Sequence, residues 1–424
     1  MGGGGAVPRA LHLADARRVV RSCAGRGLLV NWCPVKLHPS DIIYLDNNGT
    51  TAVDPVVVAE MMPYLTDFYG NPSSAYTFGS QVKEAIETAR ERVANLLGCA
   101  ATEIIFTSCG TESNNAAIHS ALMIDPDRQH IVTSAVEHSA IIKHGEALAR
   151  RGVEVTWLPV DSDGHIDLSQ LENAVREDTA IVSLMWANNE TGVLFPIEEA
   201  AAIARVKGAL FHTDAVQAVG KIPIRLADSK INFLSVSGHK LHCPKGVGVL
   251  YANRKSRFNS YLLGGSQENG KRAGTENVPY IVALGKAAEL AGTAMKTENT
   301  EVKELRDHFE TTLLSALDGI EVNGDRVNRL PNTSNLAIRG VESEALLILL
   351  DQRGICCSGG SACTTGSLTP SHVLMAMGFS QERARSSIRF SFSRYNSKAE
   401  VDRALEIIIS IVRKLRGMNA MAVA

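Results

Sequence analysis

The sequence predicts an α/β fold in which helices cover both faces of a mostly parallel sheet. Between residues 104 and 252, short apolar runs typical of strands alternate with longer segments of helical periodicity. This alternation is typical of βαβ units, whose crossover helices pack on a parallel sheet. The predicted strands are 104–107, 131–135, 154–158, 180–185, 210–213, 233–236 and 248–251. The predicted helices between them are 112–122, 140–150, 168–176 and 197–206.

Beyond residue 295 the pattern changes and predicts a smaller α+β domain. Long helical patterns at 302–317, 342–353 and 399–415 alternate with short strand candidates at 334–338 and 387–391. Segment 41–55 precedes the first helix of the larger domain, and we expect it to pack with the small one. The predicted division is a leader at 1–40, a large domain at 56–295, and a small domain formed by 41–55 and 296–424.

Composition indicates a folded globular chain with small-molecule chemistry. Of its 424 residues, 45% are hydrophobic and 21% are charged, and the formal net charge is −2. This balance gives no reason to expect a nucleic-acid partner. A membrane partner is not expected either, because no apolar run reaches the roughly 18 residues of a spanning helix. The 8 cysteines form no C-x-x-C pair, which argues against a zinc site or disulfide scaffold and favours a reducing compartment.

The first 40 residues differ in charge from the rest of the chain. They contain one acid, Asp15, and six basic residues, which are Arg9, Arg17, Arg18, Arg21, Arg26 and Lys36. Arginine-rich, acid-poor composition is typical of an organellar transit peptide, although the segment is poor in serine. The competing interpretation is a disordered leader or an upstream stretch translated in error. We therefore expect a cytoplasmic protein, with the mitochondrial matrix as the alternative if residues 1–40 are a transit peptide.

Two loops that follow predicted strands contain groups suited to an anion and an aromatic ring. Gly110 and Thr111 open a helix, where backbone N–H groups and the helix dipole favour a phosphate. The same residues are also compatible with an ordinary helix start. His138 follows the strand at 131–135 and can stack on a cofactor ring or relay protons. Its alternative role is as a packed or capping histidine.

Asp214 and Lys240 follow consecutive predicted strands and together predict a cofactor. Ligands of parallel sheets bind beyond the carboxyl ends of the strands, so both side chains can reach one crevice. The aspartate can pair with a protonated pyridine nitrogen, and Gln217, one helical turn on, can donate to a ring hydroxyl. Lys240, preceded by Ser237 and His239, can form a Schiff base with a carbonyl cofactor. These groups predict pyridoxal 5'-phosphate (PLP) chemistry, whereas Lys240 alone would more readily be a surface lysine.

Four further residues suit substrate, phosphate or nucleophilic roles. Asn189 can bond a substrate carboxylate or the ring hydroxyl, and Arg389, within a predicted strand, needs an anionic partner. That partner is either a substrate carboxylate or a structural ion pair. Thr275 lies in a polar loop suited to a phosphate, including one in a neighbouring subunit's site. Cys363 lies in a segment rich in Gly, Ser and Thr, where an exposed thiol can act as a nucleophile once ionised.

From about residue 43 to 416 the chain resembles the cysteine desulfurases, in the branch associated with nitrogenase and iron–sulfur cluster assembly. Seven motifs carry the resemblance, in order: Tyr44-Leu45-Asp46-Asn47-Asn48, Gly70-Asn71-Pro72-Ser73-Ser74, Thr107-Ser108-Cys109-Gly110-Thr111-Glu112, His212-Thr213-Asp214-Ala215-Val216-Gln217, Ser237-Gly238-His239-Lys240, Arg272-Ala273-Gly274-Thr275-Glu276-Asn277 and Gly360-Ser361-Ala362-Cys363. The chain departs from the family pattern at Gly49, Tyr76 and Gly359, where Ala, His and Ser are usual.

The resemblance implies the PLP-dependent aspartate-aminotransferase-like (type I) fold and a role for each candidate residue. Lys240 would hold PLP, Asp214 its ring nitrogen, and His138 would stack on the ring. Asn189 and Gln217 would contact ring substituents. The phosphate would be held by Gly110, Thr111, Ser237 and His239, with Thr275 reaching in from the second subunit of a homodimer. Arg389 would bind the carboxylate of L-cysteine.

The resemblance also implies that Cys363 takes the sulfur as a persulfide and releases alanine. The persulfide would pass to an iron–sulfur scaffold or another acceptor protein, in nitrogen fixation or in general cluster assembly. No resident metal is expected, and at most Cys363 would contact a transient iron–sulfur cluster. A selenocysteine lyase and a non-catalytic sulfur-relay scaffold are the alternative functions. An aminotransferase fits less well, because it needs no such cysteine.

Overall fold

The computed structural model describes residues 41–359 and 370–423. The predicted leader at 1–40 and the segment that contains Cys363 lie outside the described residues. Within the described ranges, no helix is both long enough and apolar enough to cross a membrane.

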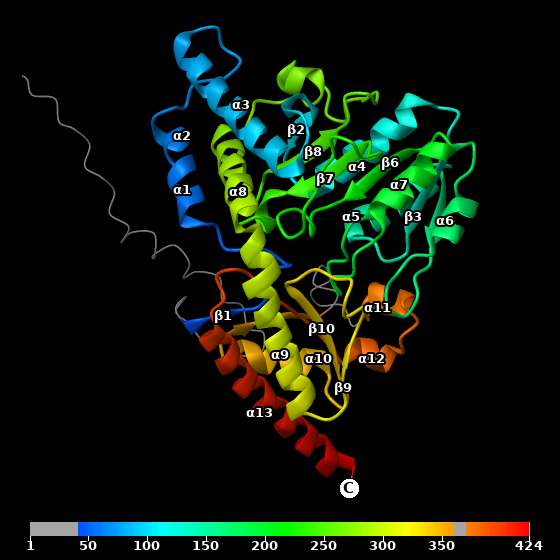
Figure 1. The fold of residues 1–424 in the computed structure, drawn as a ribbon, viewed down its shortest axis with the longest axis vertical. Helices are drawn as coiled ribbons and strands as arrows, with labels where there is room; N and C mark the ends of the chain where they lie inside the picture. Colours follow the sequence, from blue (N-terminus) through cyan, green and yellow to red (C-terminus); the bar gives the residue numbers. More distant parts are fainter. Residues whose placement is uncertain (1–40, 360–369, 424) are drawn as a thin grey trace, which may run out of the picture. The chain divides into compact units, whose positions relative to one another are not determined.

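The larger sheet has seven strands and is mostly parallel, as predicted (Figure 1). In spatial order they are β2 (Ile104–Thr107), β8 (Gly248–Ala252), β7 (Phe233–Ser237), β6 (Leu210–Asp214), β5 (Thr179–Met185), β3 (His130–Ser134) and β4 (Glu154–Leu158). Strand β8 runs antiparallel to both of its neighbours, and every other pair in this sheet is parallel. The alternating pattern did not predict the direction of β8.

Helices cover both faces of this sheet because neighbouring side chains of each strand point to opposite sides. Ile104 packs in a core cluster that contains residues of the helices on one face, whereas Ile105 packs in the cluster on the other. The first face carries α3 (Thr77–Leu97), α6 (Leu168–Ala174), α7 (Ile197–Val206) and α8 (Val278–Thr297). The second carries α4 (Gly110–Ile124) and α5 (Ser139–Ala149).

A smaller antiparallel sheet belongs to a separate core cluster. Its strands, in order, are β12 (Ser358–Gly359), β13 (Ser387–Ser391), β10 (Thr333–Ile338) and β9 (Ile320–Val322). The cluster joins Ile43 and Leu45 to apolar residues between 302 and 412. Strand β1 (Ile43–Tyr44) pairs with β11 (Ile355–Cys356), so the start of segment 41–55 packs here, whereas the backbone of Thr51 and Asp54 donates to His239 and His242 of the larger domain. The exact domain boundaries at residues 55 and 295 stay a prediction.

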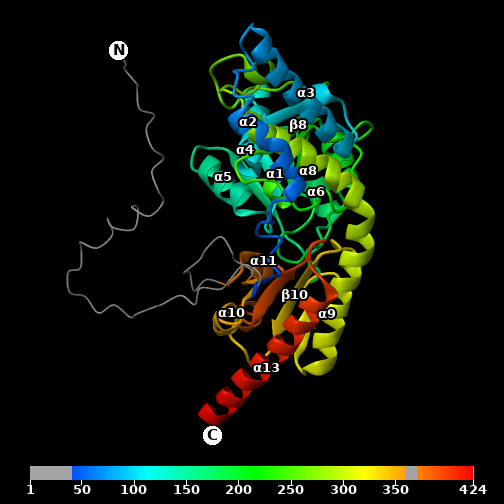
Figure 2. The same ribbon diagram turned by 90° about the vertical axis from the view of Figure 1, so that its left-hand side faces the viewer.

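The remaining helices flank these two cores. They are α1 (Pro55–Met61), α2 (Pro63–Thr66), α9 (Lys303–Ala316), α10 (Ser343–Asp351), α11 (His372–Ala376), α12 (Gln381–Arg385) and α13 (Lys398–Val423). A π-helical turn, Glu298–Val302, joins α8 to α9 without a loop. Figures 1 and 2 show this continuous helical segment in yellow-green to yellow, passing from the larger sheet to the smaller one.

Helices α3 and α8 pack closely because a glycine lies at their contact. A Cβ atom added to Gly285 would lie 2.5 Å from the Cα of Ala89 and 3.2 Å from its carbonyl oxygen. No real Cβ makes a contact that short with backbone, so any side chain at 285 must push the two helices apart. Gly292, on the same helix, has only Leu96 Cδ1 nearby, at 3.8 Å.

We therefore predict opposite effects of two alanine substitutions on one helix. Gly285→Ala should lower the free energy of unfolding by about 1–3 kcal/mol, because overpacking outweighs the better helix propensity of alanine. Gly292→Ala should be neutral or stabilising by up to about 1 kcal/mol. Urea unfolding followed by circular dichroism measures both. Equal stability of the two variants would contradict the close contact.

Candidate active site

The carboxyl ends of the parallel strands open into a cavity of about 500 Å³. Ten of the residues singled out from the sequence line it: Gly110, Thr111, His138, Asn189, Asp214, Gln217, Ser237, His239, Lys240 and Arg389. They come from the loops after β2, β3, β5, β6 and β7, and from β13 of the smaller sheet. The structure thus brings together residues more than 250 positions apart, while their chemical roles stay predictions.

Lys240 lies on a single 3₁₀ turn, Gly238–Lys240, directly after β7. Its ammonium donates to the backbone carbonyls of Asn48 and Gly49, the latter at 2.6 Å. The apolar strand Phe233–Ser237 is buried throughout, so the lysine is carried to the cavity on a rigid support. This position differs from that of the surface lysine that an isolated Ser-Gly-His-Lys sequence would allow.

Asp214 ends β6 and is buried, with both carboxylate oxygens engaged. Oδ2 accepts from the side-chain amide of Asn114 at 2.7 Å, and Oδ1 accepts from the backbone N–H of Val216 at 3.0 Å. Two donors therefore fix the carboxylate at the cavity wall. Asn114 was missed by the sequence analysis, although it lies on α4 one turn after Gly110 and so on the same face of that helix.

The start of α4 lines the cavity with Gly110 and Thr111 and packs closely against the neighbouring strand ends. A Cβ at Gly110 would lie 2.8 Å from Val216 Cγ2 and 3.4 Å from Ser237 Cβ, so this close packing requires glycine. His239 contacts Thr50 Oγ1 through Nδ1 at 3.1 Å. Burial, reinforced by the positive charge of Lys240, lowers the pKa of His239 to about 4. This histidine is therefore neutral at pH 7 and can offer one N–H to an anion.

His138 both caps a helix and lines the cavity, so the two interpretations of this residue are compatible. Its Nδ1 accepts from the backbone N–H of Ala140 at 3.2 Å, at the start of α5. A neutral ring that accepts at Nδ1 carries its proton at Nε2. Glu137 beside it is fully buried, and burial raises the pKa of its carboxyl to about 8.

His372 is a second cavity histidine, and the sequence analysis missed it. Its Nε2 lies 2.9 Å from the backbone carbonyl of Glu137. Because a carbonyl only accepts, Nε2 must carry a proton, which leaves Nδ1 as the acceptor of a neutral ring. The adjacent Ser371 donates to Glu190, another cavity residue, at 2.5 Å. No sequence signal separated this His from others, since its position depends on contacts with distant loops.

Arg389 is almost fully buried in β13 and lines the cavity. Its Nη2 pairs with Asp46 at 2.7 Å, and its Nη1 donates to the carbonyl of Asn189 at 2.9 Å. The structural ion pair considered from the sequence is therefore present. The buried Nε has no hydrogen-bond partner among the described residues. The guanidinium thus retains a donor beyond its internal contacts.

One described candidate residue, Thr275, does not line this cavity. Thr275 lines a different cavity of about 180 Å³, together with Thr107, Glu268 and Arg272. A single chain therefore does not bring Thr275 to the site, and its contribution from a second subunit stays a prediction. Cys363 lies outside the described residues. Among the described residues, Ser358 pairs with Arg389 in the smaller sheet and His372 lines the cavity.

No group of three or more His, Cys, Asp or Glu side chains is arranged to hold a metal ion within residues 41–359 and 370–423. The cavity wall combines one lysine, one arginine, three imidazoles, small-residue backbone and the carboxyl side chains of Asp46, Glu190 and Asp214.

Comparison with known proteins agrees with this geometry. Residues 43–404 match the family model described as aminotransferase class-V. The chain is 56% identical over 378 residues to cysteine desulfurase 2 of Trichormus variabilis, covering 89% of this chain and 95% of the relative. It is 52% identical to the cysteine desulfurase NifS of Azotobacter vinelandii, covering 89% and 94%.

A solved structure described as a NifS-like protein superposes with a TM-score of 0.83 at 37% identity, covering 88% of this chain and 99% of that one. This likeness confirms the predicted type I fold. Because the sequence matches span most of both chains, the resemblance is confirmed, and the chain belongs to the class-V aminotransferases and, among them, to the cysteine desulfurases.

Proposed function

We propose that this cysteine desulfurase binds PLP through Lys240 and moves the sulfur of L-cysteine to Cys363, leaving a persulfide for iron–sulfur cluster assembly. One observation carries the proposal. Lys240, Asp214 and His138 lie at or just beyond the carboxyl ends of three strands of the larger sheet and line the same cavity. A Schiff-base lysine and a carboxylate for the ring nitrogen are the two groups that PLP chemistry uses.

The residues present fit PLP. The glycine-lined start of α4, with Thr111, Ser237 and the neutral His239, would hold the phosphate. Asp214, held by Asn114, would hold the ring nitrogen, and Lys240 would hold the cofactor covalently. When bound, PLP supplies an electron sink that makes the Cα–H bond of an amino acid acidic.

Lys240 would have a second task as the general base at Cα of the substrate. It would remove the proton from Cα of cysteine and return a proton during product formation. Its contacts with the carbonyls of Asn48 and Gly49 orient the Nζ in the meantime. Asp214 stabilises positive charge at the ring nitrogen throughout.

Arg389 would bind the substrate carboxylate, assisted by Asn189. A guanidinium binds a carboxylate with paired N–H donors. In the structure, Nη2 of Arg389 donates to Asp46. The substrate carboxylate would therefore accept from the same guanidinium as Asp46, or take the place of Asp46 at Nη2.

In the sulfur-transfer step, Cys363 has the role of the attacking thiol. The thiolate of Cys363 attacks the substrate sulfur, forming an S–S bond while the C–S bond breaks and its electron pair stays on carbon. Protonation of that carbon gives alanine. The net reaction converts L-cysteine and one enzyme thiol into L-alanine and one enzyme persulfide.

The partners follow from this product. An iron–sulfur scaffold or another thiol protein would accept the sulfur, and nitrogenase maturation is one such destination. Thr275 would complete the phosphate site from the second subunit of a homodimer. We propose that the reaction takes place in the cytoplasm.

A selenocysteine lyase is the second candidate function, because the same groups can bind the selenium analogue of cysteine.

We predict that Lys240→Ala abolishes the covalent cofactor adduct. Borohydride reduction followed by peptide mass spectrometry should find PLP on Lys240 in the wild type and on no lysine in the variant. Alanine formation should fall at least about 1000-fold, because the base is lost as well. Exposed Lys207→Ala is the matched control and should behave as wild type. An adduct retained in the Lys240 variant would show that a residue other than Lys240 binds the cofactor.

A second prediction separates cofactor chemistry from sulfur acceptance. Cys363→Ala should keep the visible absorbance of bound PLP but form neither alanine nor persulfide from L-cysteine. Cys99→Ala is the control, since burial raises the pKa of the Cys99 thiol to about 12 and leaves it inert. If the Cys363 variant desulfurated L-cysteine as fast as the wild type, Cys363 would not be the sulfur acceptor. Alanine formed from L-selenocysteine alone would favour the lyase.

A third prediction tests the role of Arg389. Arg389→Lys should raise the KM for L-cysteine about 10-fold or more with a smaller change in kcat, because paired donation to the carboxylate is lost. Asp46→Asn removes the ion pair but keeps the guanidinium. It should leave KM within about 3-fold of wild type. A KM that rises equally in both variants would show that the arginine is purely structural.

A further inference from the structure

Lys221 is a buried cation one helical turn beyond Gln217, a residue of the proposed PLP site. Only 8% of Lys221 and 6% of Gln217 are exposed. The Lys221 ammonium donates to the backbone carbonyl of Gln217 at 3.0 Å and to its side-chain Oε1 at 3.4 Å. The other end of the same amide, Nε2, donates to the carbonyl of Asn48 at 3.0 Å.

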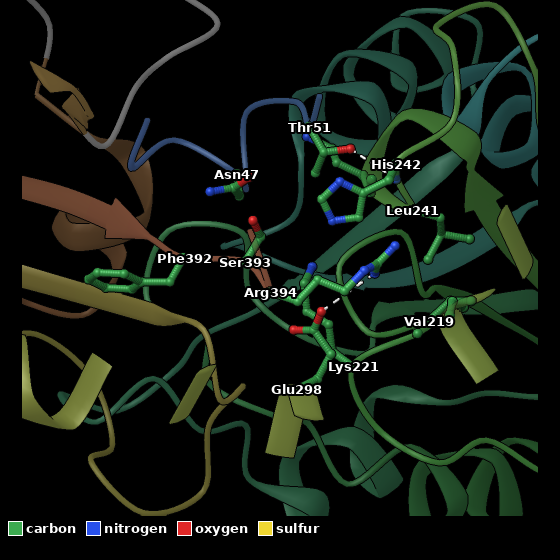
Figure 3. A pocket seen from close by; sticks show the side chains of 13 residues that line it. Asn47, Thr51, Val219, Lys221, Leu241, His242, Glu298, Phe392, Ser393 and Arg394 are labelled. Atoms are coloured by element: carbon green, nitrogen blue, oxygen red, sulfur yellow. Dashed lines mark hydrogen bonds and ion pairs between the residues drawn. The ribbon is translucent and has the colours of Figure 1, made fainter. Parts of the chain in front are cut away.

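The neighbours of Lys221 keep it charged in spite of its burial. Figure 3 shows Lys221, Glu298 and Arg394 around a small cavity of about 20 Å³, which Lys240 also lines. Burial lowers the pKa of Lys221 to about 8, and the carboxylate of Glu298 opposes that shift. Glu298 in turn lies 3.7 Å from Arg394 Nη1. Both hydrogen bonds of the Lys221 Nζ run to oxygen acceptors, which is the arrangement that an ammonium requires.

An ammonium imposes one orientation on the neighbouring amide. It has donors and no acceptor, so only the oxygen of Gln217 can face it. The NH₂ group must then point away from Lys221, toward Asn48 and the large cavity that Gln217 lines. The Asn48 carbonyl, which only accepts, favours the same orientation, so Lys221 and Asn48 hold opposite ends of the amide.

We propose that Lys221 is a positioning residue that fixes the Gln217 amide with its NH₂ group toward the cofactor ring hydroxyl. This inference rests on the proposed function, in which Gln217 contacts a PLP ring substituent. Lys221 lies behind Gln217 and acts through it. Its donation to Oε1 ensures that the amide presents a donor rather than an acceptor to the ring oxygen.

Stability alone does not account for a lysine at this position. Buried ion pairs are often replaced by apolar side chains of similar volume with little loss of stability. An apolar side chain at 221 would nevertheless leave the Gln217 amide held at one end only, by the Asn48 carbonyl. The donor at 221 holds the other end, at Oε1.

A double-mutant cycle on PLP affinity tests this inference. Apoprotein is titrated with PLP, and binding is followed by the visible absorbance of the holoenzyme. Gln217→Leu and Lys221→Met should each weaken PLP about 3- to 10-fold, as expected for one oriented hydrogen bond. The double variant should be no weaker than Gln217→Leu, because Lys221 acts only through that amide. Losses that multiply in the double variant would overturn the inference.

Two further variants separate positioning from folding. Glu298→Gln removes the carboxylate that supports the charge of Lys221, but even a neutral amine keeps two N–H donors for the Gln217 carbonyl and Oε1, so PLP affinity should stay within about 2-fold of wild type. Lys221→Met combined with Glu298→Gln leaves no lone buried charge and should fold, yet bind PLP as weakly as Lys221→Met. Wild-type affinity in this combination would contradict the role.

The visible band of bound PLP gives a second readout. Its pH midpoint should shift in Lys221→Met and Gln217→Leu by similar amounts and stay unchanged in Glu298→Gln. If the wild-type protein bound no PLP, both the proposed function and the role of Lys221 would be wrong. A wild type that binds PLP, with a Lys221→Met variant that matches its affinity and band, would overturn the role of Lys221 alone.

Discussion

The site depends on one buried residue, Asn48, which joins the two sheets. Its carbonyl accepts from both Lys240 and Gln217, at the ends of β7 and β6. Its N–H and side chain bond Ser391 and Thr333 of the smaller sheet. A polar side chain 2% exposed must satisfy its hydrogen bonds inside the protein, and here those bonds cross between the sheets. The position of the lysine relative to Arg389 is therefore fixed by a polar contact.

Buried charges reinforce the same junction. Arg389 of β13 pairs with Asp46, while Arg394, just beyond that strand, lies between Asp54 and Glu298. Removing one member of a buried pair costs about 3–5 kcal/mol, because the remaining charge is left without a partner. Glu298 begins the π-helical turn between α8 and α9, where the backbone departs from regular α geometry. Arg394 thus links the end of β13 to Asp54, whose backbone N–H donates to His242 of the larger domain.

The sequence was sufficient for the parts of the fold that depend on local patterning. Apolar runs marked all seven strands of the larger sheet to within a residue at each end, because buried strands are continuously apolar. The sequence did not predict the direction of β8, because that direction depends on which strands β8 pairs with. Of the site, Asp214 and Lys240 were recognisable because each follows a strand. Asn114 and His372 were not, because their roles depend on contacts with residues 100 and 235 positions away.

The partner of Arg389 could not be decided from the sequence. A substrate carboxylate and a structural ion pair were alternatives there, yet the structure allows both, because the guanidinium has more donors than Asp46 and Asn189 use. An arginine already oriented by Asp46 loses little side-chain entropy when a second carboxylate arrives. The ion pair is then part of the binding site. The same logic applies to Lys221 and Gln217, where a buried contact that looks structural decides which atom faces the cavity.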